Sequence, residues 1–159
     1  METTEIKSPS ASEVITTQIV LPGGTNALGT AFGGTIFGWI DVAAAVAAQR
    51  HSGGEVVTAS IDTLNFLAPV QLGDVVILRA RVNRSWRSSM EIGVRVECET
   101  VGKPGDRLHA ATAYLTFVAV DENGKPRPVA QIVPETEGDE RRYEKAARRR
   151  QARLEQRQS

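Results

Sequence analysis

The chain has 159 residues, 41% of them hydrophobic, which suits one domain with its own core. Basic and acidic residues each total 19, so the net charge is zero, and this excludes a general nucleic-acid binder held by bulk charge. The single cysteine, Cys98, excludes an internal disulfide and a cysteine metal cluster and fits a reducing compartment. Residues 1–12 hold no apolar leader, so we expect a cytoplasmic protein with no membrane or nucleic-acid partner.

In chain order, residues 1–12 are expected to be flexible. β-branched residues predict a first strand over 14–21, which Pro22-Gly23-Gly24 ends. A loop then leads to an alanine-rich segment, residues 33–49, whose apolar character on all sides predicts a buried helix. A membrane span is the competing interpretation, and the short length, Asp41 and the following strands argue against it.

Four strands are expected after the helix, at residues 57–66, 75–84, 89–101 and 108–120. Sequential strands with short turns favour an antiparallel sheet, and that sheet is the only large surface that can cover the helix. The predicted fold class is therefore α+β: a hotdog fold, with an antiparallel sheet wrapped around one long central helix. This domain would span residues 13–134, followed by a polar helix or tail over 135–159.

The C-terminal segment is predicted to form an exposed, arginine-rich helix over 139–156. Residues 139–159 carry a net charge of +4. A solvated helix or a partly disordered end is the simplest interpretation of such a pattern. Contact with a phosphate of a ligand and a nucleic-acid role, which would give steep salt dependence, are the alternatives.

Asp41 is the only charged residue between positions 33 and 49. Aspartate is a poor residue inside a helix, and a buried carboxylate is costly unless it is paired or hydrogen-bonded. Either Asp41 lies on a wet edge of the helix or bonds to a neighbouring loop, or it is a catalytic carboxylate in an apolar pocket.

The loop before the helix favours the catalytic interpretation. Its glycines, including Gly33 and Gly34, stand where the backbone can approach a partner closely. The loop ends at a helix N-terminus, whose free N–H groups attract negative charge. Those donors could hold a developing oxyanion, although helix capping alone also accounts for the glycines.

These residues resemble the acyl-CoA thioesterases of the hotdog superfamily, and in particular small bacterial acyl-CoA hydrolases related to animal cytosolic long-chain acyl-CoA hydrolase. The resemblance runs in order from about residue 14 to 145. The segments that carry it are Pro22 to Gly29, Phe32 to Gly34, Trp39 to Asp41, Asn65 to Val70, Gly73-Asp74, Arg87 to Ser89, Thr116 to Asp121, Pro134 to Glu137 and Arg142-Tyr143.

The resemblance implies hydrolysis of acyl-CoA to a fatty or other carboxylic acid and CoA. It implies that Asp41 and Asn26 are the catalytic pair, contributed by different protomers of a homodimer, and that such dimers assemble into a hexamer as a trimer of dimers. Asp41 would activate water or attack directly, with Asn26 and the N–H groups of Gly33 and Gly34 polarising the thioester. The family often has aspartate where this chain has Gly24, which puts any role of that side chain in doubt.

The resemblance also implies a slot for the rest of coenzyme A, which enters as a substrate moiety and not as a cofactor. Arg84 and Arg87 are candidates to hold its phosphates, because arginine suits bidentate phosphate contact, and a solvated turn is the alternative interpretation. Trp86 would stack on the adenine or fill an oligomer contact. No cofactor or metal is expected, because the two histidines lie in unrelated places. The candidate substrate-binding residues are Asn65, Phe66, Leu67, Pro69, Arg84, Arg87, Ser88 and Ser89.

Two other functions remain as alternatives. A hydratase or dehydratase of the same fold relies on a catalytic histidine near the central helix, whereas His51 stands at its far end and His109 starts a strand. A non-enzymatic acyl-CoA sensor or binding module usually carries a DNA-binding domain as well, and we expect none before residue 14.

Overall fold

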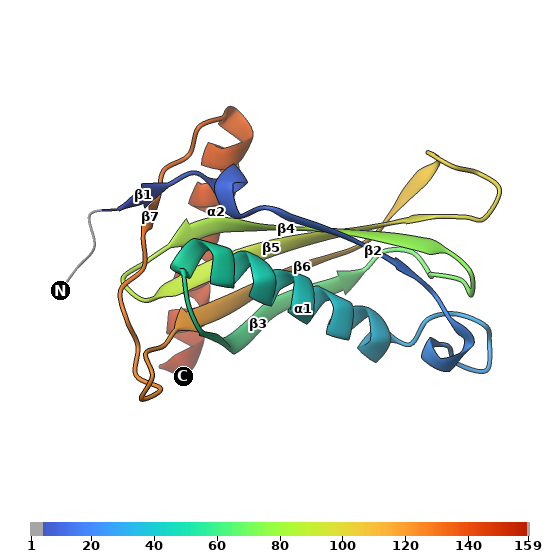
Figure 1. Ribbon diagram of the computed structural model, residues 1–159, viewed down its shortest axis with the longest axis horizontal. Helices are drawn as coiled ribbons and strands as arrows, with labels where there is room; N and C mark the ends of the chain where they lie inside the picture. Colours follow the sequence, from blue (N-terminus) through green and yellow to red (C-terminus); the bar gives the residue numbers. More distant parts are fainter. Residues whose placement is uncertain (1–4, 159) are drawn as a thin grey trace.

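A computed structural model describes residues 5–158 and shows one long helix laid along an antiparallel sheet (Figure 1). The elements in chain order are β1 (Ile6–Lys7), a short 3-10 turn (Pro9–Ser12), β2 (Val14–Ile19), a second 3-10 turn (Pro22–Gly24), α1 (Gly33–Ser52), β3 (Val56–Phe66), β4 (Val75–Ser85), β5 (Ser89–Glu99), β6 (Arg107–Ala119), β7 (Gln131–Ile132) and α2 (Glu137–Arg157).

Within the described residues, the main sheet has five antiparallel strands in the order β2-β4-β5-β6-β3. The sheet is antiparallel as predicted, but β3 and β4 are not neighbours. The segment between them, residues 67–74, connects the edge strand β3 to β4 near the opposite edge of the sheet. On its way it pairs with the loop before α1, where Ala31 N donates to Val70 O at 2.7 Å and Leu72 N donates to Gly29 O at 2.8 Å. β3 therefore forms one free edge of the sheet.

The predicted helix is confirmed, and it extends to Ser52, but the prediction that it is buried on all sides is wrong for the single chain, because Val42 is 65% exposed on the side away from the sheet. Its alanines Ala43, Ala44, Ala47 and Ala48 pack on the apolar face of the sheet, formed on β5 by Met90, Ile92, Val94 and Val96. Small alanine side chains let the helix approach the strands closely, so burial here is nearly complete. Gly53 ends α1 with a φ of 75°, a left-handed conformation that glycine adopts without strain.

The C-terminal helix exists as predicted, but the prediction that it is exposed on all sides is wrong. α2 lies across the face of the sheet opposite α1 (Figure 1). Arg149 binds both carboxylate oxygens of the fully buried Glu91 at 2.7 and 2.9 Å, and Arg153 binds Asp62 of β3 at 2.8 Å. Two arginines of α2 thus bind carboxylates on the sheet. The polar sequence of the helix does not predict these contacts, because the carboxylates lie far away in the chain.

Part of the N-terminal segment that we predicted to be flexible has defined partners, while residues 1–4 lie outside the described part. β1 pairs in parallel with β7, and Lys7 Nζ donates to the backbone oxygen of His51 at 2.9 Å. A two-residue strand leaves no period in the sequence, so pattern analysis does not find it.

Candidate active site

Asp41 is half-buried in the middle of α1 and is hydrogen-bonded to the neighbouring strand. The Thr58 hydroxyl of β3 donates to Asp41 Oδ1 at 3.0 Å. Asp41 therefore lies at a partly exposed edge of α1, its partner belongs to the sheet and not to a loop, and it is not among the residues that line the apolar pocket at the start of the helix. Thr58 thus holds one of the two carboxylate oxygens of Asp41, and the side chain remains partly exposed to solvent.

The structure adds Thr58, which sequence analysis missed. The only available signal was a hydroxyl residue on a strand expected to pass beside the helix. The pairing of β3 with β6 shifts register between Thr58 and Ser60 and again between Ile61 and Thr63. These irregularities break the period-two pattern that would have assigned Thr58 to the face toward α1.

Asn26 organises the loop before α1. Its Oδ1 accepts from the backbone N–H groups of Leu28 at 2.9 Å and Thr30 at 3.2 Å, and its Nδ2 donates to the Thr30 hydroxyl at 2.8 Å. Among the described residues, no hydrogen bond joins Asn26 to Asp41 within one chain. Within the single protomer, the side chains of the predicted catalytic pair therefore have separate partners, Thr30 and Leu28 for Asn26 and Thr58 for Asp41.

The N-terminus of α1 opens onto an apolar pocket of about 360 Å³. The N-cap residue Phe32 offers no side-chain acceptor to the first-turn amides, and Gly33 and Gly34 are exposed. A Cβ on Gly33 would lie 3.4 Å from the ring of Phe66, so glycine permits the close contact between helix and strand. The pocket brings together several predicted site residues, namely Gly33, Phe66, Leu67 and Pro69, with Thr30, Ala31, Ile36, Ala68 and Val70.

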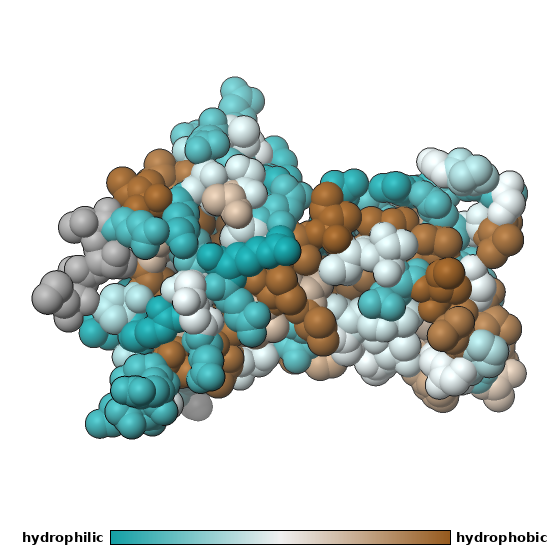
Figure 2. Space-filling view, in the orientation of Figure 1, coloured by the Kyte–Doolittle hydropathy of each residue, from teal (hydrophilic) through white to brown (hydrophobic). Residues whose placement is uncertain are grey.

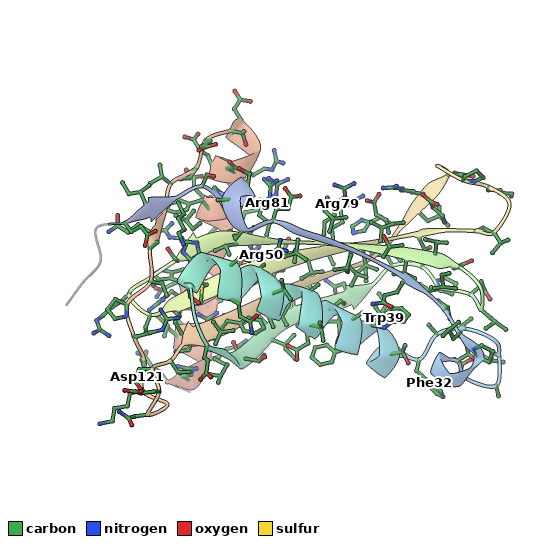
Figure 3. All side chains as sticks on the ribbon, viewed as in Figure 1. Phe32, Trp39, Arg50, Arg79, Arg81 and Asp121 are labelled. Carbon is green, nitrogen blue, oxygen red and sulfur yellow. The ribbon has the colours of Figure 1, made fainter. Side chains whose placement is uncertain are left out.

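The second group of predicted substrate residues lies at the other end of the sheet, around the turn between β4 and β5. The 11 residues of β4 separate the two ends, a length of about 36 Å. Arg87 is exposed, whereas the Arg84 guanidinium stacks 3.8 Å from the Tyr143 ring and donates to the Tyr143 backbone oxygen at 3.3 Å. In Figure 3 the labelled Phe32 lies near one of these ends and Asp121 near the other, and Trp39 and Arg50 lie along α1 between them.

The two histidines have other partners. His51 is buried at the end of α1 and its Nε2 bonds the backbone oxygen of Ala130 at 2.8 Å, and burial is the main reason why its pKa is lowered. His109 bonds Thr112 at 2.6 Å on β6. In the part of the chain that the structure describes, no cluster of three His, Cys, Asp or Glu side chains could hold a metal ion.

The predicted α1 is not a membrane span: none of the helices in residues 5–158 has the length and apolar character needed to cross a bilayer. Cys98 is buried on the apolar face of β5.

Comparison with known proteins agrees with this architecture. The family model of the thioesterase superfamily matches residues 28–104. The uncharacterized acyl-CoA thioester hydrolase YkhA of Bacillus subtilis is 46% identical over 137 residues, which are 86% of this chain and 79% of that protein. Some animal relatives are longer, and the chain spans 24% of acyl-coenzyme A thioesterase 11 of Mus musculus at 35% identity.

Solved structures match along nearly the whole chain. An apo-hexameric acyl-CoA thioesterase has 41% identity and a TM-score of 0.91, with 96% of this chain and 97% of that chain covered. An acyl-CoA hydrolase from Staphylococcus aureus, in complex with butyryl coenzyme A, coenzyme A and coenzyme A disulfide, has 39% identity and a TM-score of 0.90, with 96% and 92% covered. Further structures of that enzyme carry alanine in place of an asparagine, an aspartate and a threonine.

These matches confirm the predicted hotdog fold of a thioesterase. The chain belongs to the thioesterase superfamily and, within it, to the acyl-CoA thioester hydrolases.

Proposed function

We propose that this chain hydrolyses acyl-CoA to a carboxylic acid and CoA, at a site built from Asp41 and Thr58 of one copy and Asn26 of a second. The observation that carries the proposal is the Asp41 carboxylate, half-buried on an otherwise apolar helix and held at 3.0 Å by Thr58. A carboxylate fixed in this way, with one oxygen left for water, has the geometry of a general base.

In the proposed reaction, Asp41 takes a proton from water as the water oxygen attacks the thioester carbon. The carbonyl oxygen becomes an oxyanion, which the amides of Gly33 or Gly34 stabilise together with Asn26. When the tetrahedral intermediate collapses, the carbon–sulfur bond breaks and the CoA thiolate leaves, taking up the proton that Asp41 removed from water. Direct attack by Asp41, giving a mixed anhydride that water then cleaves, is the alternative route.

The spacing of three residues supports this assignment. The asparagine, aspartate and threonine replaced in the Staphylococcus aureus enzyme stand 15 and 17 residues apart along its chain. Asn26, Asp41 and Thr58 have the same spacing here. We infer that these three side chains take part in the same site.

The free edge of β3 supports a site shared by two copies. Apolar side chains lie exposed along it and on the adjoining face of α1, including Val57 at 48%, Ile61 at 45% and Val42 at 65%. Figure 2 shows hydrophobic side chains gathered over α1 and over the loop at its N-terminal end. Exposed apolar surface of this kind, beside an unpaired strand, is typical of an interface.

Antiparallel pairing of two β3 strands around a two-fold axis would bring opposite ends together. The Phe66 end of one strand would then lie beside the Val56 end of the other, near Thr58. Because Gly33 contacts Phe66, the partner's Asn26 loop and apolar pocket would approach Asp41. We propose that this dimer is the active unit and that three dimers form a hexamer. The same arrangement would join the two separated groups of substrate residues.

The test is release of CoA thiol from palmitoyl-, butyryl- and phenylacetyl-CoA, followed with a colorimetric thiol reagent. We expect wild-type protein to cleave at least one of them and Asp41→Asn to lose on the order of a hundred-fold or more in rate, because amide cannot act as a base. The order of the three substrates then defines the acyl preference.

Binding of acyl-CoA without thiol release from any of the three would overturn the proposal and favour a sensor. Full activity of Asp41→Asn would remove Asp41 from the mechanism while leaving hydrolysis in place.

A further inference from the structure

A group of arginines surrounds Trp86 at the turn between β4 and β5. The Arg150 guanidinium of α2 lies 4.4 Å from the Trp86 ring, and the Arg84 guanidinium lies 5.9 Å from the same ring. Arg150 also approaches the Ser89 hydroxyl, at 3.4 Å. Trp86 thus holds a cation on α2 against the first residue of β5.

Two further arginines of α2, Arg153 and Arg157, act on Arg150, and these four cations outnumber their carboxylate partners. Burial, and then the charges of Arg153, Arg84 and Arg157, lower the pKa of the Arg150 guanidinium. Within residues 5–158, Asp62 is the only carboxylate in an ion pair with any of these four arginines, and it binds Arg153 at 2.8 Å. Among the described residues Arg84, Arg150 and Arg157 thus have no carboxylate in an ion pair, and an anionic ligand would supply the counter-charge.

An open pocket of about 350 Å³ adjoins this group. Trp86 and Tyr143 supply aromatic surface to the pocket, and the exposed Arg87 stands at it with no hydrogen bond or ion pair to its side chain among the described residues. Arginines beside aromatic rings suit a ligand that carries both phosphate groups and a flat base.

From this geometry we infer that α2 binds the phosphate groups of the nucleotide end of acyl-CoA, through Arg150 beside Trp86 and Arg157 two helical turns further along α2. The inference rests on the proposed function, and it assigns to the C-terminal helix a role in substrate recognition. Arg84, whose guanidinium is fixed on Tyr143, supplies positive potential and not a direct contact.

The position of the group relative to Thr58 fits this assignment. Val57, Val118 and Ser89 face one another across β3, β6 and β5. Two strand spacings separate Val57 from Ser89, a distance of about 10 Å. This is shorter than the pantetheine arm between the thioester and the diphosphate, so a CoA whose acyl group lies near Thr58 can pass round the end of the sheet to the arginines.

The experiment compares two thioesters with the same acyl group, butyryl-CoA and S-butanoyl-N-acetylcysteamine, which lacks the nucleotide. We expect Arg150→Gln and Arg157→Gln each to raise KM for butyryl-CoA about ten-fold with little change in kcat, since each removes one charge-assisted phosphate contact. Hydrolysis of the nucleotide-free thioester should not change. Calorimetry should show wild type binding adenosine 3′,5′-bisphosphate, and both variants binding it more weakly.

Arg148→Gln is the matched control, because Arg148 is exposed on the same helix and the charge change is identical. It should behave as wild type in all three assays. Arg157 is also exposed, so its replacement leaves the fold intact even if Arg150→Gln lowers the melting temperature.

Unchanged KM for butyryl-CoA in both variants would overturn the inference, and so would an equal loss in Arg148→Gln. Weaker bisphosphate binding with unchanged KM would also overturn it, because the phosphate would then belong to a separate nucleotide. If wild type cleaves neither thioester, the proposed hydrolysis fails, whereas calorimetry with the bisphosphate still decides whether α2 binds the nucleotide.

Discussion

Thr58 controls the position of the carboxylate that the proposed mechanism uses. Its hydroxyl is the donor to Asp41 Oδ1, and the contact crosses from β3 to α1. A general base must point at the water that it activates, so the Thr58 hydroxyl would contribute to the rate by fixing the direction of the Asp41 carboxylate. In the proposed mechanism Thr58 is therefore a positioning residue, and its effect is separable from that of Asp41.

Replacing Thr58 by valine keeps the shape of the side chain and removes the donor. We predict that Thr58→Val lowers kcat roughly ten-fold, the effect of one hydrogen bond to a charged group, while the melting temperature stays near that of wild type. Steady-state kinetics with the best substrate of wild type measure this. Thr58→Ser retains a hydroxyl and should keep most of the activity. Equal losses in the two variants would show that the hydrogen bond to Asp41 does not contribute to the rate.

At the scale of elements, α2 is anchored by a buried ion pair. Glu91 is 0% exposed, and it is bound by Arg149 at two oxygens and by Asn83 Nδ2 at 3.0 Å. The Arg149 guanidinium also stacks 3.6 Å from the Tyr114 ring. Breaking a buried pair by removing one partner costs more than replacing both, because an unpaired charge stays inside.

We predict that Arg149→Met lowers the free energy of unfolding by about 3–5 kcal/mol, because it leaves Glu91 buried without its cation. Urea unfolding followed by circular dichroism measures the change. The double variant Arg149→Met with Glu91→Leu should recover most of the loss. A double variant as unstable as the single one would show that the cost comes from packing and not from the unpaired carboxylate.

The sequence predicted most elements because their signals are local. The alternation in β5 and the alanine run in α1 are physical consequences of one buried face, so the pattern reports them directly. The neighbours of β3 and the packing of α2 depend on contacts far apart in sequence, such as Arg149 with Glu91. The face on which Thr58 lies was not predictable either, because β3 shifts register twice near it and the strand does not keep a regular period of two.

The candidate site was predictable in part for the same reason. Asp41 could be selected as the one charge in an apolar helix, and Gly33 by its place at the helix start. Asn26 was selected only by family resemblance, since an asparagine in a loop has many structural uses. In the single chain Asn26 serves one of them, because its side chain closes its own loop.

At the scale of the whole molecule, one protomer carries the parts of the proposed site at separate places. Asp41 and Thr58 lie on the open side of α1 and β3, while Asn26 and the apolar pocket lie at one end of the molecule. A two-fold dimer across β3 joins the parts of opposite copies and covers the exposed apolar side chains at the same time. Function would then depend on association, and dissociation would abolish activity without unfolding the chain.

The most direct test of this account mixes two inactive variants, Asn26→Ala and Asp41→Asn, after dissociation and reassembly. Each hybrid dimer would contain one site with both intact residues, so random pairing predicts recovery of about one quarter of wild-type activity. Equal mixing without reassembly is the control and should stay inactive. Recovery near this level would support a site shared by two copies, whereas a reassembled mixture that remains inactive, although hybrids are present, would contradict it.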